Sequence, residues 1–270
     1  ERRNMANSMI SLLTDLGHHD HYVGLMKAIM WDIHPTANIV DLCHEINPYD
    51  IVEAAFKLEC SYRYFPSRSV HVVIVDPEVG SDRRPIMAAG DNHFFIAPDN
   101  GVLSWVYESD NVQRVYEITA SHYFMENVSN TFHGRDIFAP CAARLLRIMD
   151  PTAFGDEITD YRKFKIPVAE VVAGKEIKGK IISIDRFGNC ITNMFEDDVQ
   201  KMVEQAGKDN ISIAAGSTNI KGLSDYYAQK EVKQPVALIG NAGYLEISLN
   251  KGHAARELKL RKNLDIILSA

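Results

Sequence analysis

The strongest constraint on the fold is a regular alternation of short apolar runs with longer helical segments between Ser8 and about Asp150. The runs SMISLLTDL and NIVDLC are predicted strands, and SVHVVIVD is β-branched almost throughout, as expected of a central strand covered on both faces. The segment DHYVGLMKAIMWDI repeats its apolar residues at helical spacing, and Asp50 begins a second helical segment that ends before Pro66. This pattern predicts an α/β domain in which a mostly parallel sheet is sandwiched between helices.

The pattern changes after Pro167, where short strand-like runs are separated by turns. These runs are KGKIISID, CITNM, NISIAAG, PVALIG, GYLEISL and LDIILSA, and one helical segment at about residues 196–205 interrupts them. Short strands at such spacing predict a small β-barrel or sandwich. We therefore expect an N-terminal α/β domain over residues 1–165 and a smaller C-terminal β-domain over residues 166–270.

Charge and composition narrow the class of partner. The formal net charge of −7 argues against a nucleic-acid partner, because that affinity comes from clustered Lys and Arg. No apolar run approaches the roughly 20 residues that span a bilayer, and the first residues lack the apolar stretch of a signal peptide. The four cysteines lie far apart without CxxC spacing, which is typical of buried thiols in a reducing compartment. We expect a cytoplasmic protein without a membrane partner.

Acidic and amide side chains follow three of the predicted strands. Asp15 ends the first strand and Asp76 ends the central one, while Asp99 and Asn100 follow the HFFIA strand. In open α/β sheets, ligands bind beyond the carboxyl ends of the strands. The sequence therefore predicts that these three turns converge on one crevice.

The segment TDLGHHDH, residues 14–21, concentrates carboxylates and imidazoles, which are common metal ligands. However, His18, His19 and His21 are consecutive or nearly so around a helix start, and such neighbours point in different directions. Asp20 is placed to cap that helix by accepting from its free N–H groups. We expect no metal here, and a metal-dependent hydrolase that uses these histidines is an alternative hypothesis.

Common signatures of α/β enzymes are absent from the sequence. No GxGxxG follows the first strand and no GxxxxGK[ST] occurs, so a dinucleotide or P-loop phosphate site lacks its sequence basis. A GxSxG nucleophile elbow is absent as well. The usual α/β chemistries are therefore mostly excluded.

Seven stretches, taken together and in order, resemble one enzyme family. They are TDLG-x2-D-x-YVG-x2-K, INPYD, VDPEVG followed by Arg83, APDNG, TFHGRDIFAP, DRFGN-x2-TN, and GYLEI with Asn250. Together they cover about residues 8–268 and are similar to the S-adenosyl-L-methionine (SAM) hydroxide adenosyltransferases, also called adenosine-forming SAM hydrolases, which are related to fluorinase and chlorinase. Any one stretch alone would be a weak signal, but their joint order is a strong one.

The resemblance implies a fold, an assembly and a reaction. The fold is an N-terminal α/β domain followed by a C-terminal β-barrel, and the assembly is a homotrimer whose active sites lie between one subunit's first domain and its neighbour's barrel. The reaction converts SAM and water into adenosine and methionine, and it requires no cofactor. SAM, adenosine and methionine are then the expected small-molecule partners.

The family's catalytic set of aspartate, arginine and histidine maps onto Asp76, Arg83 and His133. The sulfonium of SAM is already an activated leaving group, so the difficulty is to hold a water in line with the C–S bond and to ease the loss of its proton. The resemblance implies that Asp76 and His133 hold this water. Arg83 would stabilise its hydroxide character and fix Asp76.

The resemblance also implies binding residues in both domains. Asp15 would accept both ribose hydroxyls, since one carboxylate can take two O–H donors, and Tyr49 would offer a ring face to the ligand. From the barrel, Asn189 would read the adenine edge and Asp185 would pair with the methionine ammonium. Weaker candidates near the same site are Asn193, Tyr244 and Glu246.

Departures from the halogenase pattern favour water as the nucleophile. Halogenases carry tyrosine-type residues where this chain has Asp76 and His133, and a serine halide ligand where it has Gly134. The Ser-Arg pair that precedes GYL in halogenases is replaced by Asn241 and Ala242. A carboxylate at position 76 would repel fluoride or chloride.

One departure concerns the hydrolases themselves. They usually read DPGVG, and this chain has Glu78 at the glycine position. If that position requires a positive φ, Glu78 strains the turn that carries Asp76. A SAM- or adenosine-binding module with negligible turnover is therefore the alternative hypothesis, and a SAM-dependent halogenase is a less favoured one.

Overall fold

A computed structural model describes residues 8–110, 112–172 and 175–270 of the chain. The chain forms two compact units, the first ending at Ile166 and the second beginning at Pro167. Each unit buries a hydrophobic core of its own.

The first unit is built on a sheet whose strand order is β2-β1-β3-β5-β4-β6-β7 over the described residues. The strands are β1 (Met9–Thr14), β2 (Asn38–Cys43), β3 (Val70–Ile74), β4 (Pro85–Ala89), β5 (Phe94–Pro98), β6 (Arg114–Glu117) and β7 (Glu157–Ile158). Neighbouring strands from β2 to β5 are parallel, whereas those from β5 to β7 are antiparallel. The prediction of a mostly parallel sheet is therefore wrong, and the sheet is mixed.

Strand β4 accounts for the difference. Its sequence, PIMAA, begins with proline and contains two alanines, and both residue types are depleted in strands. It pairs antiparallel with β5 on one side and with β6 on the other, and Met87 at its centre is fully buried. Tertiary packing thus overrides a weak local preference for the strand conformation.

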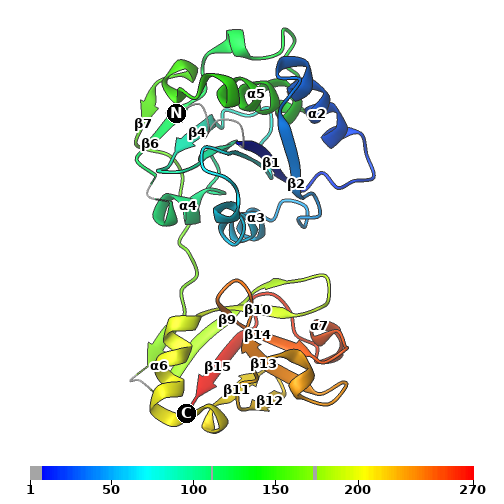
Figure 1. The fold of residues 1–270 in the computed structure, drawn as a ribbon, viewed down its shortest axis with the longest axis vertical. Helices are drawn as coiled ribbons and strands as arrows, with labels where there is room; N and C mark the ends of the chain where they lie inside the picture. The colour runs from blue at the N-terminus through cyan, green and yellow to red at the C-terminus, as the bar shows by residue number, and fades with distance from the viewer. Residues whose placement is uncertain (1–7, 111, 173–174) are drawn as a thin grey trace. The chain divides into compact units, whose positions relative to one another are not determined.

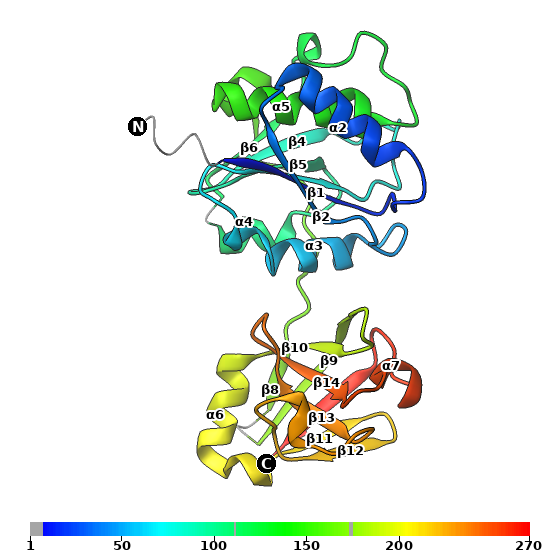
Figure 2. The same cartoon turned by 45° about the vertical axis from the view of Figure 1, so that its right-hand side comes forward.

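Helices cover both faces of this sheet (Figures 1 and 2). One face carries α2 (Tyr22–Ile33) and α5 (Ala139–Ile148), and the other carries α3 (Ile51–Glu59) and α4 (Ser104–Ser109). A π-helical turn, η3 (Gly134–Phe138), leads directly into α5. Because both faces are covered, β3 is buried at every residue.

The helix starts agree with the sequence in one case and differ in another. The side chain of Asp50 caps α3 by accepting from the N–H of Glu53, as its position predicts. The predicted capping role of Asp20 is wrong, because α2 starts after His21 without a side-chain cap and Asp20 is exposed.

The second unit contains a separate antiparallel sheet, in the order β12-β11-β15-β9-β10-β14-β13 with β8 paired to β9. Its strands are β8 (Glu170–Val172), β9 (Glu176–Ile184), β10 (Cys190–Phe195), β11 (Ser212–Ala215), β12 (Thr218–Lys221), β13 (Pro235–Ile239), β14 (Tyr244–Leu249) and β15 (Asp265–Ser269). The end strands β12 and β13 lie in contact, so the sheet is nearly closed into a barrel. Helix α6 (Glu196–Ala206) confirms the predicted helical segment, and a short helix, α7 (Ala254–Glu257), precedes the last strand.

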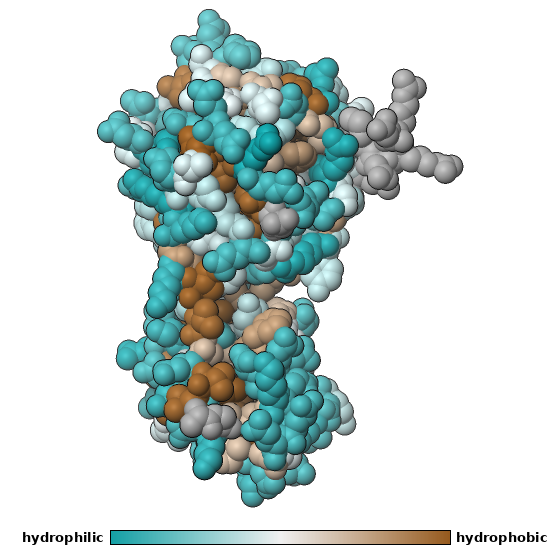
Figure 3. Space-filling model, turned by 90° about the vertical axis from the view of Figure 1, so that its left-hand side faces the viewer, coloured by the Kyte–Doolittle hydropathy of each residue, from teal (hydrophilic) through white to brown (hydrophobic). Residues whose placement is uncertain are grey.

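The surface and the thiols bear on the expected class of protein. The face drawn in Figure 3 is mostly hydrophilic, with apolar side chains interrupting it in patches. No helix in the described part of the chain is long and apolar enough to cross a membrane.

All four cysteines are free, and burial raises the pKa of the Cys60, Cys141 and Cys190 thiols to about 12, so these three are uncharged at neutral pH.

A hydrogen-bonded pair of histidines is buried in the first unit. Ser11 Oγ lies 2.7 Å from His71 Nδ1, and His71 Nε2 lies 3.1 Å from His93 Nδ1. Burial, together with the nearby His93, lowers the pKa of His71 to about 3, and burial also lowers the pKa of His93. Both imidazoles are therefore neutral in the folded protein at neutral pH.

These histidines predict an acid-labile fold. His71 binds a proton in the unfolded chain below pH about 6.5 but not in the folded protein, so stability falls as the pH drops from about 6.5 toward about 3. We expect the free energy of unfolding in urea to fall by about 2 kcal/mol between pH 7 and pH 5 from His71 alone. A His71→Gln variant should show a shallower dependence on pH, and parallel curves for the two proteins would contradict this expectation.

Candidate active site

The turn between β3 and β4 brings two of the predicted catalytic residues together. Arg83 donates from Nε to both carboxylate oxygens of Asp76, at 3.0 and 2.9 Å, and its Nη2 also pairs with Asp76 Oδ2. The side chain of Arg83 is 0% exposed and that of Asp76 is 5% exposed. A buried ion pair with this geometry fixes the orientation of the carboxylate.

Arg83 also contacts the third predicted residue, His133. Its Nη2 lies 2.8 Å from His133 Nδ1. A guanidinium has only donors, so Nδ1 must accept, and the proton of the neutral imidazole lies on Nε2. Burial and the positive charge of Arg83 lower the pKa of His133, which keeps the ring neutral near pH 7. Nε2 has no hydrogen-bond partner among the described residues and is a donor.

His133 is positioned by the π-helical turn that it precedes. Asp136, which is 1% exposed, accepts from the N–H of Ser129 at 2.9 Å, and its own N–H donates to the carbonyl of Phe132. Arg135 pairs with the same carboxylate at 2.6 Å. Burial raises the pKa of Asp136, but the hydrogen bonds from Arg135 and Ser129 outweigh it, so this carboxyl stays ionised. The turn is thereby fixed to the loop before it.

Asp15 lies in the turn after β1 and is held by backbone and buried side chains. The N–H of Tyr49 donates to Asp15 Oδ2 at 2.9 Å. Thr14 Oγ1 accepts from the N–H of Leu16 and lies 2.8 Å from His44 Nδ1. His44 Nε2 in turn lies 2.9 Å from Asp41 Oδ1, the carboxylate that Lys27 also contacts.

Sequence reasoning missed this chain of contacts, although Lys27 belongs to the first motif. His44 is 1% exposed, and burial lowers its pKa in spite of Asp41. A neutral His44 donates from Nε2 to Asp41 and accepts from the hydroxyl of Thr14 at Nδ1. The only sequence signal for it was a histidine directly after a strand, which alone is too common to be specific.

Asp15, Asp76 and His133 line one cavity of about 320 Å³ in the first unit. The other lining residues are Leu16, Tyr22, Pro48, Tyr49, Ile74, Val79, Thr131, Phe132 and Gly134. The cavity thus has mainly apolar and aromatic walls with a few polar groups, which is typical of a small-molecule site. Tyr49 is 70% exposed, and its backbone has φ of +67°, a conformation that few residues other than glycine adopt.

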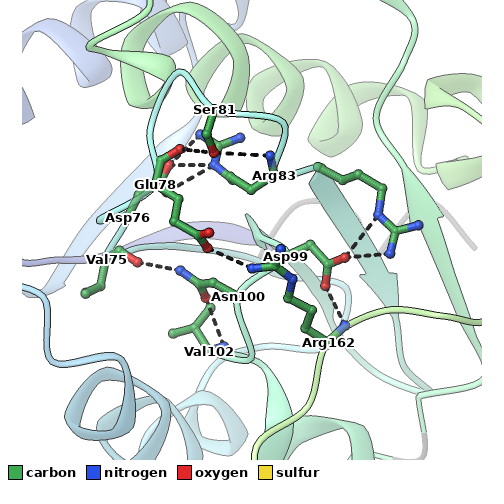
Figure 4. Close-up of polar contacts among 10 residues, drawn as sticks. Val75, Asp76, Glu78, Ser81, Arg83, Asp99, Asn100, Val102 and Arg162 are labelled. Atoms are coloured by element: carbon green, nitrogen blue, oxygen red, sulfur yellow. Dashed lines mark hydrogen bonds and ion pairs between the residues drawn. The ribbon is translucent and has the colours of Figure 1, made fainter.

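The turn that carries Asp76 is not strained at Glu78. Glu78 is absent from the residues with positive φ in the described part of the chain, and the left-handed position is Gly80, with φ of +80°. The Glu78 carboxylate accepts from Arg162 Nη1 at 2.8 Å (Figure 4). The expected strain is therefore wrong, because the family's usual glycine at this position is not required for a positive φ.

The third predicted turn does not reach the cavity. Asp99 and Asn100 do not line it and contact the chain around Asp76 and Arg83 instead (Figure 4). The prediction that three turns converge on one crevice therefore holds for Asp15 and Asp76 only.

In the second unit, Asp185 and Asn189 close a turn on each other. Asp185 Oδ1 accepts from the N–H of Phe187 at 2.9 Å and of Asn189 at 2.8 Å, and Oδ2 accepts from Asn189 Nδ2 at 2.8 Å. The ring of Phe187 is 74% exposed beside them. A ligand role for the two polar residues stays a prediction, with Asn189 Oδ1 and one position on Asp185 left to accept.

Asn193, Tyr244 and Glu246 are the remaining candidates of the second unit. Asn193 Oδ1 accepts from the N–H of Lys180, and its Nδ2 donates to the carbonyl of Pro167. Glu246 Oε1 accepts from Tyr227 and from a serine hydroxyl, both at 2.7 Å. Tyr244 packs against Phe195. Asn193 and Glu246 are therefore buried structural anchors of the barrel in this arrangement, and their ligand roles stay predictions.

The histidines of TDLGHHDH do not form a metal site. His18, His19 and His21 are exposed, and His18 packs edge-on against His44. Among the described residues, no three His, Cys, Asp or Glu side chains are grouped so that they could hold one metal ion.

Two family models match the chain. The SAM hydroxide adenosyltransferase N-terminal domain matches residues 10–155, and the C-terminal domain of the same family matches residues 179–267. The chain belongs to the SAM hydroxide adenosyltransferase family. The resemblance drawn from the seven sequence stretches is thereby confirmed.

The relatives of this chain include proteins with two functional names. The (R)-S-adenosyl-L-methionine hydrolase of Methanocaldococcus jannaschii is 34% identical, with 93% of this chain and 92% of that protein covered. A fluorinase from Nocardia brasiliensis is 26% identical, with 97% of each chain covered. The crystal structure of an uncharacterized conserved protein from Thermotoga maritima has a TM-score of 0.92 at 33% identity and covers 97% of this chain and 100% of that one.

Proposed function

We propose that this chain hydrolyses SAM to adenosine and L-methionine by in-line attack of a water on ribose C5′. The observation that carries the proposal is the single Arg83 nitrogen, Nη2, that contacts both Asp76 and His133 at the wall of one cavity. Both groups lie within hydrogen-bond reach of the same atom, so the carboxylate and the imidazole are neighbours, and we place one water between Asp76 and His133 Nε2. The other supports are family membership and a hydrolase relative at 34% identity.

The tautomer of His133 assigns the proton transfers. Its Nε2–H donates to the water and cannot take a proton from it, so the proton passes to the Asp76 carboxylate. The water oxygen forms a bond to C5′ as the C5′–S bond breaks, and the electron pair of that bond stays on sulfur as the thioether of methionine. Arg83 stabilises the hydroxide that develops. Asp76 then releases the proton to solvent, which balances the reaction.

The binding roles follow from the same cavity. Asp15 has one oxygen engaged by the N–H of Tyr49, which leaves Oδ1 and a second position on Oδ2 for the two ribose hydroxyls. We also propose a homotrimer in which Asp185, Asn189 and the exposed Phe187 contact a ligand that is bound in the cavity of a neighbouring subunit. Analytical ultracentrifugation with and without adenosine tests that assembly.

Two observations weigh against the alternative functions. The hypothesis of a binding module without turnover rested on strain at Glu78, which has no positive φ. For a halogenase, the serine halide ligand would replace Gly134, and a Cβ at that position would lie 3.1 Å from the ring of Phe132 and 3.3 Å from Met26 Sδ. Such contacts are tight, and a carboxylate at Asp76 repels a halide.

Isotope labelling tests the proposed bond. We expect SAM incubated with the protein in H₂¹⁸O to yield adenosine that carries ¹⁸O at the 5′ oxygen and methionine that carries none. Mass spectrometry of both products measures this, with chloride and fluoride added in parallel reactions. Unlabelled adenosine, 5′-halogenated adenosine or no product would each overturn the proposal.

The exposed ring of Tyr49 supplies a further prediction. In Tyr49→Gly the backbone keeps its N–H for Asp15 and escapes the left-handed penalty, so stability should stay within about 1 kcal/mol of the wild type. Loss of the ring should weaken adenosine binding by roughly tenfold, as measured by calorimetry. Unchanged affinity in the folded variant would remove Tyr49 from the binding residues.

A further inference from the structure

Two adjacent residues after β5 hold the two ends of the turn that carries Asp76 and Arg83 (Figure 4). At one end, Asn100 Nδ2 donates to the carbonyl of Val75 at 2.8 Å, and Val75 is the residue directly before Asp76. Asn100 Oδ1 accepts from the N–H of Val102 at 3.1 Å. Both the nitrogen and the oxygen of the Asn100 side-chain amide are thus hydrogen-bonded. Through Val75, this amide holds the backbone directly before Asp76.

At the other end, Asp99 holds Arg84, the residue directly after Arg83. Asp99 Oδ2 accepts from Arg84 Nε at 3.1 Å and from Nη2 at 2.7 Å, and the N–H of Asp99 donates to the carbonyl of Arg84. The side chain of Asp99 is 2% exposed and that of Arg84 is 24% exposed, so solvent screens this pair only in part. Asn100 and Asp99 together form a clamp that holds Val75 and Arg84, and Asp76 and Arg83 lie between these two residues.

The chain just before the end of the first unit reinforces this clamp. The N–H of Arg162 donates to Asp99 Oδ1 at 2.7 Å, and Arg162 Nη1 donates to Glu78 at 2.8 Å (Figure 4). Asp160 contacts Arg84 at 2.8 Å. Glu78 and Arg162 are both largely exposed, so their ion pair contributes little energy, and the buried Asp99 is the main anchor.

We infer that Asp99 and Asn100 are positioning residues that set where Asp76 and Arg83 stand relative to the ribose carbon. Neither residue lines the cavity, so we assign them no direct contact with the substrate. The inference rests on the proposed hydrolysis, and it assigns the APDNG stretch to the geometry of the attack instead of to ligand binding. A displacement of about 1 Å at reacting groups costs on the order of 10²-fold in rate.

The substitution Asn100→Asp tests the inference with almost no change in shape. It keeps an oxygen for the N–H of Val102 but turns an acceptor toward the carbonyl of Val75. At pH 8 we expect kcat to fall by about 10- to 100-fold while KM for SAM changes by less than about threefold. As the pH falls toward 5, the introduced carboxyl takes up a proton and can donate to Val75, so the ratio of variant to wild-type kcat should rise.

A second substitution and a matched control complete the experiment. Asp99→Asn keeps an acceptor for the N–H of Arg162 but removes the charge that pairs with Arg84, and it should lower kcat in the same way. If the Asn100→Asp variant does not fold, the kcat of the Asp99→Asn variant tests the inference. Asn38→Asp makes the same charge change at an exposed residue of the edge strand β2 and should leave kcat unchanged.

Adenosine affinity separates positioning from general damage. Calorimetry should give wild-type affinity for both variants, because Asp15 and Tyr49 are not touched. Wild-type kcat in the folded variants, or a parallel loss of kcat and adenosine affinity, would overturn the inference alone. A wild-type protein that does not turn SAM over would overturn the proposed function and this inference with it.

Discussion

Asp76→Asn should reduce SAM hydrolysis by about 10²- to 10⁴-fold, the range typical for removal of a general base. The amide keeps the shape of the carboxylate and one acceptor for Arg83, but it can take no proton from water. It also leaves the buried Arg83 without its counter-charge, which destabilises the fold by about 3 kcal/mol or more. Initial rates of adenosine release and urea unfolding measure the two effects.

The same turn provides the control for this prediction. Asp82 is exposed and makes no hydrogen bond or ion pair among the described residues, so Asp82→Asn changes the charge equally without touching the site. We expect wild-type rate and stability for it. If both variants lost activity to the same extent, net charge and not the proton acceptor would be responsible, and the proposed role of Asp76 would fail.

Gly80→Ala should be among the most destabilising single-methyl changes in the first unit. Gly80 has φ of +80°, and a Cβ there would lie 2.1 Å from the carbonyl oxygen of Asn130. The left-handed conformation costs about 1–2 kcal/mol for alanine, and relief of the clash costs a further 1–3 kcal/mol. We expect a loss of about 3 kcal/mol and a fall in Tm of about 10 °C. Activity should fall as well, because Asn130 lies in the loop that leads to His133.

Gly24→Ala is the matched substitution with the opposite expected sign. Gly24 lies in α2, is exposed, and has no atom within 4 Å of the position that a Cβ would take. Alanine there should stabilise the protein by about 0.5–1 kcal/mol, because it lowers the entropy of the unfolded chain. Calorimetric melting of the two variants side by side measures both shifts. A similar loss in both would show that the clash at Asn130 is not the cause.

Much of the fold could be predicted from the spacing of apolar residues along the sequence. The runs that form β1, β2 and β3 are largely apolar, and β3 is also rich in β-branched residues. Asp50 stands where its carboxylate caps α3, so local preference and tertiary structure agree there. Strand β4 was not accessible, because PIMAA has no alternation and its strand conformation is imposed by β5 and β6. Strands β6 and β7 were not predicted either, and the antiparallel pairs formed by β4, β6 and β7 make the sheet mixed.

Part of the candidate site could be predicted for a different reason. Asp15 and Asp76 end parallel neighbours, so their turns must meet at one edge of the sheet, whereas the approach of Arg83 to His133 depends on the π-helical turn. No pattern in the sequence predicts that turn. The structure likewise gives Asp99 a partner, Arg84, that follows from neither spacing nor composition, because the antiparallel strand β4 brings the two together.

The contacts of residues 160–164 determine which splice point suits a chimera that exchanges the second unit. The family's N-terminal domain model ends its match at residue 155, before Asp160, Arg162 and Phe164 make their contacts with Arg84, Asp99 and Ser104. A chimera with a fluorinase spliced at 155 would exchange these contacts together with the second unit. A splice at 166 would retain them, and should better preserve the preference for water that we propose.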